Sequence, residues 1–405
     1  MFSNQNKIPA VVINKGGPNG LGAVQGLGRK GIPVISVDFD PKNITFFSKY
    51  ATTRICPNPG KSETKFINYL INFGKQFTAK PVLFSTVDEL LLIILKHKKE
   101  LEKYYRCPIG EPNVVLKLLN KKIFYQTLGE LNAPYAETYF PESITEVESI
   151  SANLDYPYLI KPVYSYSFKK KFRTNCFKAD SSEELIELYK KATTIDEEII
   201  LQKVISGSER YLVSTYFNRN SKPVAICCYK KVRIFPIDFG NASVCESEWN
   251  REAAELSMRV LENIGYYGIA EAELQRDPLD GKLKLIEINA RTTTEARLSV
   301  RCGMNMEHIA YCDILGNRIE KNEFQIEGVK WINIISDLLA TFSSSGYIRN
   351  GKLTLREWLN SLKGEREYAI FAWDDPAPFL VLLYQFLASY AFKFKTYRTI
   401  LSLRR

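Results

Sequence analysis

Residues 282–291, KLKLIEINAR, are the stretch from which the fold is predicted. Apolar and polar side chains alternate in it, which is typical of a strand with one buried face. The pair Asp280-Gly281 precedes it, and Gly268–Gln275 on the other side of that pair also has the pattern of a strand. Asp-Gly between two such segments is a strong hairpin signal. We therefore expect two antiparallel strands joined by a tight turn.

The predicted hairpin gathers acidic side chains on one face. Because side chains alternate along a strand, Glu271 and Glu273 share a face of the first strand. On the second strand Glu287, Asn289 and Arg291 share one. Clustered carboxylates repel each other unless a cation lies between them, and Mg²⁺ takes oxygen ligands together with substrate phosphates. The pattern favours a Mg²⁺–nucleotide site over an exposed strand with solvated acids.

The first part of the chain has the pattern of a separate α/β unit. Pro9–Asn14 and Pro33–Asp38 are short β-branched runs, and the glycine-rich segment Gly16–Gly22 and a helical stretch lie between them. This strand–helix–strand order repeats loosely up to about residue 110. We expect a small, doubly wound parallel sheet.

The pattern changes after Pro134, where a helix predicted over Lys122–Leu131 must end. Short strands follow at close spacing with scattered helices, which is typical of an α+β region. A third segment begins near residue 319 and is predicted to be helical at Glu357–Leu362 and Ala377–Phe392.

Composition and charge exclude several classes of protein. The chain is 45% hydrophobic and 25% charged, as an ordinary folded protein is. Of its net charge of +10, +5 lies in residues 377–405, so the main body does not have the basic face of a nucleic-acid-binding protein. Eight cysteines without a C-x-x-C pair, and only His97 and His308, do not favour a zinc site. A polar N-terminus and the lack of a long apolar run predict a cytoplasmic protein.

Several residues outside the hairpin fit phosphate binding, although each alone is equally well a surface residue. Lys161 ends an apolar strand and could present its charge to a phosphate. Lys121 begins a helix, where free backbone N–H groups also bind phosphate. Tyr164–Asn175 is basic and is predicted to be a loop that closes over phosphates. Arg233 adds charge from another basic run.

Taken in order, these motifs resemble the ATP-grasp superfamily, and within it the carboxylate–amine ligases that include D-aspartate ligases and carbamoyl-phosphate-synthase-like domains. The resemblance covers nearly the whole chain, and its specific part is AEAEL (270–274) together with IEINAR (286–291). The other matching segments are PAVV (9–12), GGPNGLG (16–22), NKKIFY (120–125), LIKPV (159–163), LQKVISGSE (201–209) and DFG (238–240).

The resemblance implies an α/β plus α+β architecture in three parts. These are a Rossmann-like pre-ATP-grasp domain over residues 1–112, an ATP-grasp domain over 113–318 and a C-terminal helical extension over 319–405. It also implies that Lys121 and Lys161 hold the phosphates of ATP and that Glu209 binds the ribose. The residues that would line the adenine are Gln202, Lys203 and Ile205.

The same resemblance implies that Glu273, Glu287 and Asn289 hold Mg²⁺, with Mn²⁺ as the alternative ion. Arg233 and Arg291 would stabilise the transferred phosphoryl group and an acyl phosphate. The implied reaction is ATP-dependent activation of a small-molecule carboxylate and its joining to an amine that approaches from the first domain. An amino acid of cell-wall or surface-polymer synthesis is the expected kind of substrate, and a homo-oligomer is compatible with the sequence.

The chain departs from the family pattern at four places. Asn120 and Lys203 stand where family members commonly have acids, and Ala290 replaces the usual proline. The segment Tyr164–Asn175 holds none of the glycines usual in the phosphate-covering loop. This last departure is compatible with a second function, an inactive ATP-grasp scaffold that serves as a binding or membrane-adaptor subunit.

A dinucleotide-binding oxidoreductase is a third alternative, suggested by the glycine-rich segment and Asp38. Its spacing, G-x-x-G-x-G at Gly17, Gly20 and Gly22, differs from the usual G-x-G-x-x-G. That function would also leave the acidic hairpin without a role.

The C-terminal tail leaves two interpretations open. Phe379–Phe392 is mostly apolar, and its 14 residues, at ~1.5 Å each, are too few to span a membrane. They either pack on the protein's own core or lie at the inner face of a membrane, where the basic residues would meet anionic lipid. Those basic residues are Lys393, Lys395, Arg398, Arg404 and Arg405.

Overall fold

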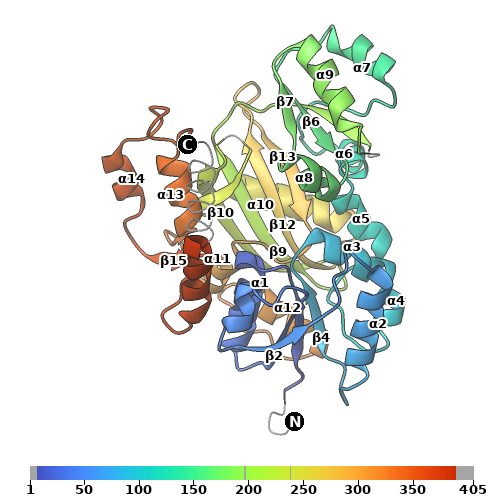
Figure 1. The fold of residues 1–405 in the computed structure, drawn as a ribbon, viewed down its shortest axis with the longest axis vertical. Coiled ribbons are helices and arrows are strands. Elements are labelled where there is room, and N and C mark those ends of the chain that lie inside the picture. Colours follow the sequence, from blue (N-terminus) through green and yellow to red (C-terminus); the bar gives the residue numbers. More distant parts are fainter. Residues whose placement is uncertain (1–6, 196–197, 238, 389–405) are drawn as a thin grey trace, which may run out of the picture.

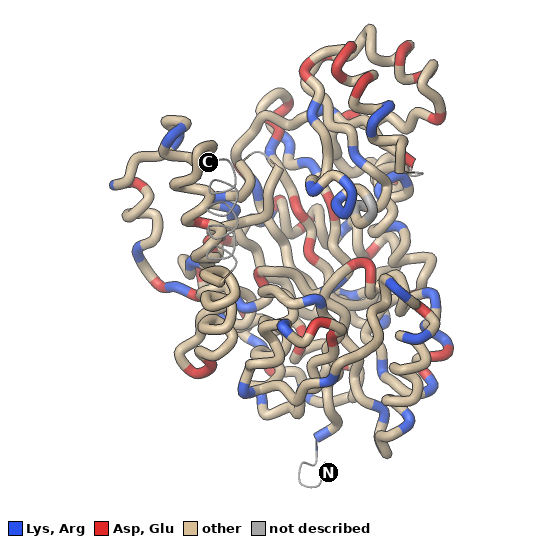
Figure 2. Tube along the Cα trace, viewed as in Figure 1, with Lys and Arg blue, Asp and Glu red and all other residues tan. Residues whose placement is uncertain are grey.

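The computed structural model describes residues 7–195, 198–237 and 239–388 (Figure 1). Asp238 of the DFG segment, the end of the predicted tail helix and the basic residues that follow it lie outside these ranges. The strands of the described chain form a four-stranded sheet, a seven-stranded sheet and a second four-stranded sheet. Acidic and basic positions are interspersed along the chain (Figure 2).

The predicted N-terminal α/β unit is confirmed. Its sheet is parallel, with the strand order β3-β2-β1-β4. The central strand β1 (Ala10–Ile13) is buried on both faces, because Val11 and Ile13 pack in one core cluster and Ala10 and Val12 in another. The other elements of the unit are β2 (Val34–Asp38), β3 (Ala51–Ile55), β4 (Val82–Ser85), α1 (Gly17–Gly28), η1 (Ile44–Phe47), α2 (Glu63–Gly74), α3 (Asp88–Lys96) and α4 (Lys98–Leu101).

The glycines of α1 serve close packing. A Cβ at Gly20 would lie 2.8 Å from the Cβ of Asn14, and one at Gly22 would lie 3.0 Å from the Cβ of Ala296. Ala296 begins α11 (Ala296–Arg301), so the glycines let a helix of the first unit approach one from far along the chain. The glycine-rich segment therefore has a structural role without a dinucleotide.

The predicted hairpin is confirmed and lies at one edge of the seven-stranded sheet, whose order is β13-β12-β9-β10-β11-β14-β15. β12 (Gly268–Arg276) and β13 (Leu283–Asn289) pair antiparallel, and Glu273 faces Glu287 while Glu271 faces Asn289. The adjoining elements are β9 (Arg210–Phe217), β10 (Pro223–Phe235), β11 (Asn241–Ser247), α10 (Arg251–Asn263) and α12 (Met306–Leu315).

The third sheet has its own small core and forms the part of the molecule at the upper right of Figure 1. Its order is β5-β8-β6-β7, and the predicted strands at β6 (Tyr158–Pro162) and β8 (Ile199–Lys203) are confirmed. The remaining elements of this region are β5 (Thr138–Tyr139), α7 (Ile144–Ser151), α8 (Ser165–Phe172), β7 (Phe177–Ala179) and α9 (Ser182–Ala192). The helices α5 (Pro112–Leu119) and α6 (Lys121–Glu130) precede it in the chain, and their buried residues belong to the large core that includes the N-terminal unit and the hairpin.

The prediction of a loop over Tyr164–Asn175 is wrong, because most of this segment is the helix α8. It contains neither glycine nor proline, and the lysines Lys169–Lys171 lie in the last turn, where cations are favourable to the helix dipole. Arg173 ends the helix in a left-handed conformation with φ 57°.

The sequence suggested a purely helical C-terminal extension, but the extension also contains two short strands. β14 (Lys330–Ile332) and β15 (Arg366–Tyr368) join the seven-stranded sheet, since β14 pairs with β11 and β15 pairs parallel to β14. These strands are three residues each, too short for a periodic signal. The extension also contains α13 (Ile334–Phe342), α14 (Leu355–Ser361) and a helix whose described residues are 377–388.

Contacts with the first unit hold the extension in place. Asp375 accepts hydrogen bonds from the amide of Gln25 at 2.9 Å and from the hydroxyl of Ser48. Asp374 accepts two from the guanidinium of Arg29, at 2.8 and 3.0 Å, and one from the hydroxyl of Tyr50 at 2.7 Å. Within the described ranges, no helix has both the length and the apolar character needed to cross a membrane.

A buried ion pair connects the extension to the central sheet. The guanidinium of Arg233 on β10 donates to both carboxylate oxygens of Asp337 on α13, at 2.7 and 3.1 Å, and each side chain is 3% exposed. Removing one partner of a buried pair leaves an uncompensated charge in a medium of low polarity.

We expect Asp337→Ala to lower the free energy of unfolding by about 3–5 kcal/mol, measured by urea denaturation. Glu255→Ala, which removes the exposed pair of Arg251 and Glu255, should leave the denaturation midpoint unchanged. Equal midpoints for both variants would contradict a stabilising role for the Arg233–Asp337 contact.

Candidate active site

The predicted metal-binding side chains lie together on β12 and β13. Glu273 and Glu287 are opposite each other, and the amide of Asn289 donates to Glu287 Oε1 at 3.2 Å. All three are partly buried. Two carboxylates and an amide oxygen on neighbouring strands are a donor set that fits Mg²⁺ and leaves room for phosphate oxygens to complete its coordination.

The predicted phosphate-binding lysines lie on two elements, Lys161 near the end of β6 and Lys121 at the start of α6. Lys161 at the end of β6 donates from Nζ to Gln202 Oε1 at 2.7 Å. Burial lowers the pKa of Lys161, the positive charge of Lys121 lowers it further, and Glu287 and Glu273 oppose the change. Lys161 is thus close enough to Lys121, Glu273 and Glu287 for its charge to interact with theirs.

Gln202 and Tyr125 together connect the third sheet to the hairpin. Its amide donates to the hydroxyl of Thr138 at 2.9 Å, and its oxygen accepts from Lys161 and, at 3.3 Å, from the hydroxyl of Tyr125. Tyr125 also donates to the carbonyl of Ile286 on β13 at 2.6 Å. Gln202 is buried, and its hydrogen bond orients the side chain of Lys161.

The other predicted nucleotide residues are placed as follows. Ile205 is buried just after β8, where an apolar side chain would suit an adenine ring. Lys203 points to Asp155, with Nζ 2.6 Å from Oδ2. The carboxylate of Glu209 accepts from Arg276 Nε at 3.0 Å and is 38% exposed. Lys203 and Glu209 are therefore engaged by charged neighbours.

Arg291 links the acidic hairpin to the N-terminal unit. Its guanidinium donates to both carboxylate oxygens of Asp88 at 2.7 and 2.9 Å, and to Asn289 Oδ1 at 3.0 Å. Burial lowers and the carboxylate of Asp88 raises the pKa of Arg291, with a net upward change. Asp88 begins α3, directly after a strand of the parallel sheet, so the two units meet at the site.

Arg233 is not brought into this group. Its hydrogen bonds run to Asp337 and to the hydroxyl of Ser361, both in the C-terminal extension. The physical reason is a bulge in β10, which shifts the register between Lys231 and Arg233. As a result Lys231, and not Arg233, contacts the acidic hairpin.

Lys231 is the main residue that sequence reasoning missed. Its Nζ lies 2.6 Å from Glu273 Oε2, and its side chain is 5% exposed. Burial lowers and Glu273 raises the pKa of Lys231, with a net upward change. The available signal was its alternation with Cys227 and Tyr229, which are also buried on β10.

Two further acids lie deep beside the hairpin. Burial raises the pKa of Glu271 to about 8, and the neighbouring charge of Glu295 adds to this. Burial also raises the pKa of Glu295. Glu271 accepts hydrogen bonds from Ser214 and, at 2.8 Å, from Thr293. Nothing in the local sequence pattern separates these buried acids from the proposed metal ligand Glu273.

The helix α8 contacts the N-terminal unit across the site. Lys15 forms an ion pair with Glu89, and its Nζ lies 5.0 Å from the ring centroid of Tyr166 on α8. Tyr166 is 45% exposed. The aromatic ring and the ammonium therefore hold α8 against the unit that also contributes Asp88.

The arrangement of the sheets is that of the ATP-grasp fold, and comparisons with known proteins agree with this fold. No family model matches the chain. A D-aspartate ligase of Enterococcus faecium (strain Aus0004) is 25% identical over 295 residues, which cover 68% of this chain and 69% of that protein. An arginine-specific carbamoyl phosphate synthase large chain of Eremothecium gossypii is 20% identical over 214 residues, 51% of this chain but 19% of that protein.

Solved structures show the same fold. Biotin carboxylase from Campylobacter jejuni has a TM-score of 0.64 at 14% identity, over 80% of this chain and 74% of that one. The biotin carboxylase domain of Hydrogenobacter thermophilus 2-oxoglutarate carboxylase, solved as a dimer with MgADP, has 0.62 at 14%, over 80% and 73%. L-amino acid ligase from Bacillus licheniformis has 0.59 at 14%, over 76% and 75%. The resemblance predicted from the sequence is confirmed.

The contact of Tyr166 with Lys15 predicts a specific change in protease sensitivity. A cation–π contact at such a site is worth about 0.5–1 kcal/mol. Tyr166→Ala should therefore raise the rate of tryptic cleavage at Lys169–Lys171 on α8 about two- to fivefold. Mass spectrometry of the fragments measures this rate. Cleavage at Lys190 on α9 should keep its rate in both proteins, and an unchanged ratio of the two sites would refute the contact.

Proposed function

We propose that this protein is an ATP-dependent ligase that converts a carboxylate into an acyl phosphate and joins it to an amine. The observation that carries the proposal is the meeting of the acidic pair Glu273–Glu287 with Lys161 and Arg291 where the two sheets and the N-terminal unit join. The names of two relatives, a D-aspartate ligase and an L-amino acid ligase, support amide or peptide bond formation.

ATP and Mg²⁺ are the proposed cofactors, with Mn²⁺ as the alternative ion. Glu273, Glu287 and Asn289 would hold the metal. A domain of the same fold, solved with MgADP, supports a magnesium–nucleotide complex as the cofactor. When bound, the ion would neutralise charge on the phosphates during transfer. Lys161, oriented by Gln202, and Lys121 would bind the phosphates from the opposite sheet.

The residues of this chain would act mainly by alignment and charge. Arg291, fixed by two hydrogen bonds from its guanidinium to Asp88, would hold the acyl phosphate oxygens. The α8 helix, held against Lys15, would exclude water from that intermediate. The amine nitrogen then attacks the acyl carbon, the carbon–oxygen bond to phosphate breaks, and the nitrogen loses a proton. The role first proposed for Arg233, stabilising the transferred phosphoryl group, would be taken by Lys231.

For the substrates, we propose an amino acid used in the assembly of a cell wall or surface polymer. The name of the D-aspartate ligase relative supports an amino acid. The site lies between the acidic hairpin and the N-terminal unit, so the amine would approach from the side of Asp88.

Glu287→Gln should abolish ADP release, because a neutral amide at this position removes one of two facing carboxylates. The assay follows ADP release by the purified full-length protein across pools of amino acids and amines. Glu255→Gln, on the exposed face of α10, is the matched control and should keep full activity. ADP release that persists in Glu287→Gln would overturn the assigned site, and nucleotide binding without ADP release from wild type across all pools would favour an inactive scaffold.

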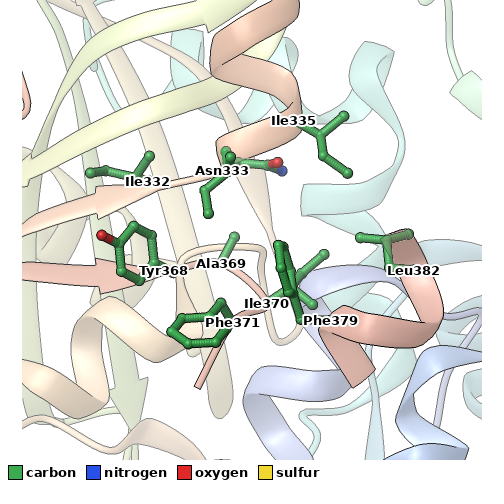
Figure 3. A pocket seen from close by; sticks show the side chains of 10 residues that line it. Ile332, Asn333, Ile335, Tyr368, Ala369, Ile370, Phe371, Phe379 and Leu382 are labelled. Carbon is green, nitrogen blue, oxygen red and sulfur yellow. The ribbon is translucent and has the colours of Figure 1, made fainter. Parts of the chain in front are cut away.

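A separate observation favours peripheral membrane attachment. Residues 377–388 form a helix whose inner face packs on the extension, since Phe379 and Leu382 line an apolar pocket with Ile332, Tyr368 and Phe371 (Figure 3). Its outer face exposes apolar side chains at helical spacing. These are Leu380 (59% exposed), Leu383 (38%), Tyr384 (73%) and Leu387 (58%).

Such a stripe followed by a basic sequence suits a surface with anionic lipid. The double substitution Leu380→Glu and Leu387→Glu should lower co-sedimentation with phosphatidylglycerol vesicles by about tenfold or more. Leu355→Glu with Leu359→Glu, two equally exposed leucines on α14, is the matched control. If wild type stays in the supernatant, or if both double variants behave alike, the stripe does not bind membranes.

A further inference from the structure

A small buried cavity lies beside the proposed ligase site, among β9, β12 and the first turn of α12. It has room for a group about the size of one water molecule. Two buried acids line it, Glu271 at 3% and Glu307 at 1% exposure, together with Arg291. The other polar side chains in its wall are the hydroxyls of Ser214, Thr292, Thr293 and Ser299.

The polar groups of this cavity are arranged as hydrogen-bond acceptors. Thr292 donates its hydroxyl proton to Glu307 Oε1 at 2.7 Å, and Thr293 donates to Glu271 Oε2 at 2.8 Å. Ser214 also donates to Glu271 Oε2. These three hydroxyl protons are committed to the two carboxyl groups, so among the polar side chains of the wall only the guanidinium of Arg291 remains as a donor, and it is engaged by Asp88.

One acceptor has no partner in the part of the chain that is described. Glu307 Oε2 is fully buried and receives no hydrogen bond from the described residues. A buried carboxyl oxygen without a donor is costly and calls for an explanation. The nearby cations are engaged elsewhere, Lys231 with Glu273 and Arg291 with Asp88.

We propose that this cavity binds a primary ammonium group of a substrate, with oxygens of the Glu271 and Glu307 carboxyl groups as its hydrogen-bond acceptors. An ammonium supplies N–H donors in a group of about the right size, whereas a carboxylate or phosphate would bring further oxygen acceptors to a wall that already holds two acids. The inference rests on the proposed ligase function for the source of the ammonium. Two sources share this chemistry: the acceptor amine, and the amino group of the amino acid whose carboxylate Arg291 would hold.

The first test uses simple cations and needs no ATP turnover. Ammonium and methylammonium chloride should raise the Tm of the full-length protein by about 2 °C or more, relative to tetramethylammonium and potassium chloride at equal ionic strength. Glu307→Gln should lose this rise, and Glu323→Gln, an exposed glutamate, should keep it. An equal rise with potassium, no rise with ammonium, or a full rise in Glu307→Gln would overturn the proposal.

Thr292→Val is the second variant, in case Glu307→Gln does not fold. It keeps the volume at Thr292 but removes the donor that orients Glu307, so the affinity for methylammonium measured by calorimetry should fall several-fold. Unchanged binding would contradict the proposed geometry.

A comparison of aspartate with succinate identifies the source of the ammonium group. A rise in Tm with aspartate alone assigns the ammonium to the activated amino acid. A rise with methylammonium but not with aspartate assigns it to the acceptor amine. Ammonium binding without ADP release would leave this proposal standing while the ligase proposal fails.

Discussion

Glu273 and Glu287 face each other across the pair of strands β12 and β13. Several neighbouring side chains compensate the repulsion between these two carboxylates. Like charges directly opposite each other weaken a strand pair unless other groups compensate. Lys231 reaches across the sheet to Glu273, Asn289 donates to Glu287, and the charge of Lys161 acts on both from the opposite sheet. The register of one hairpin therefore fixes where positive charge has to be placed on two other elements, β10 and β6.

The same register connects the nucleotide side of the site to the substrate side. Asn289 contacts Arg291 two residues along β13, and Arg291 carries the connection to Asp88 in the N-terminal unit. Movement of a side chain on the hairpin would therefore change its contacts both with the neighbouring lysines and with the N-terminal unit. Such mutual support is expected where phosphoryl transfer depends on alignment more than on covalent chemistry.

The hairpin with Glu273, Glu287 and Asn289 on its faces, and the parallel sheet, could be predicted from the sequence, because local periodicity and one Asp-Gly turn determine them. Lys161 was singled out by the resemblance to a family and not by its local pattern. Arg233 shows where such reasoning stops. The sequence around Arg233 contains no signal for the bulge in β10. Because of this bulge, Arg233 pairs with Asp337 and Lys231 contacts the acidic hairpin. The helix α8 and the short strands β14 and β15 were missed because their lengths give no periodic signal, and tertiary contacts decide their form.

The contacts of Asp374 and Asp375 with the first unit bear on how the chain is made. Gln25 and its partner Asp375 are separated by 350 positions, and Arg29 and Asp374 by 345. During synthesis the N-terminal sheet can form early, but the polar groups around Gln25 and Ser48 stay open to water until nearly all the described chain has left the ribosome. Docking of the C-terminal extension on the N-terminal unit is therefore a late step that closes a very long loop of chain. Such a step slows folding and gives chaperones time to act.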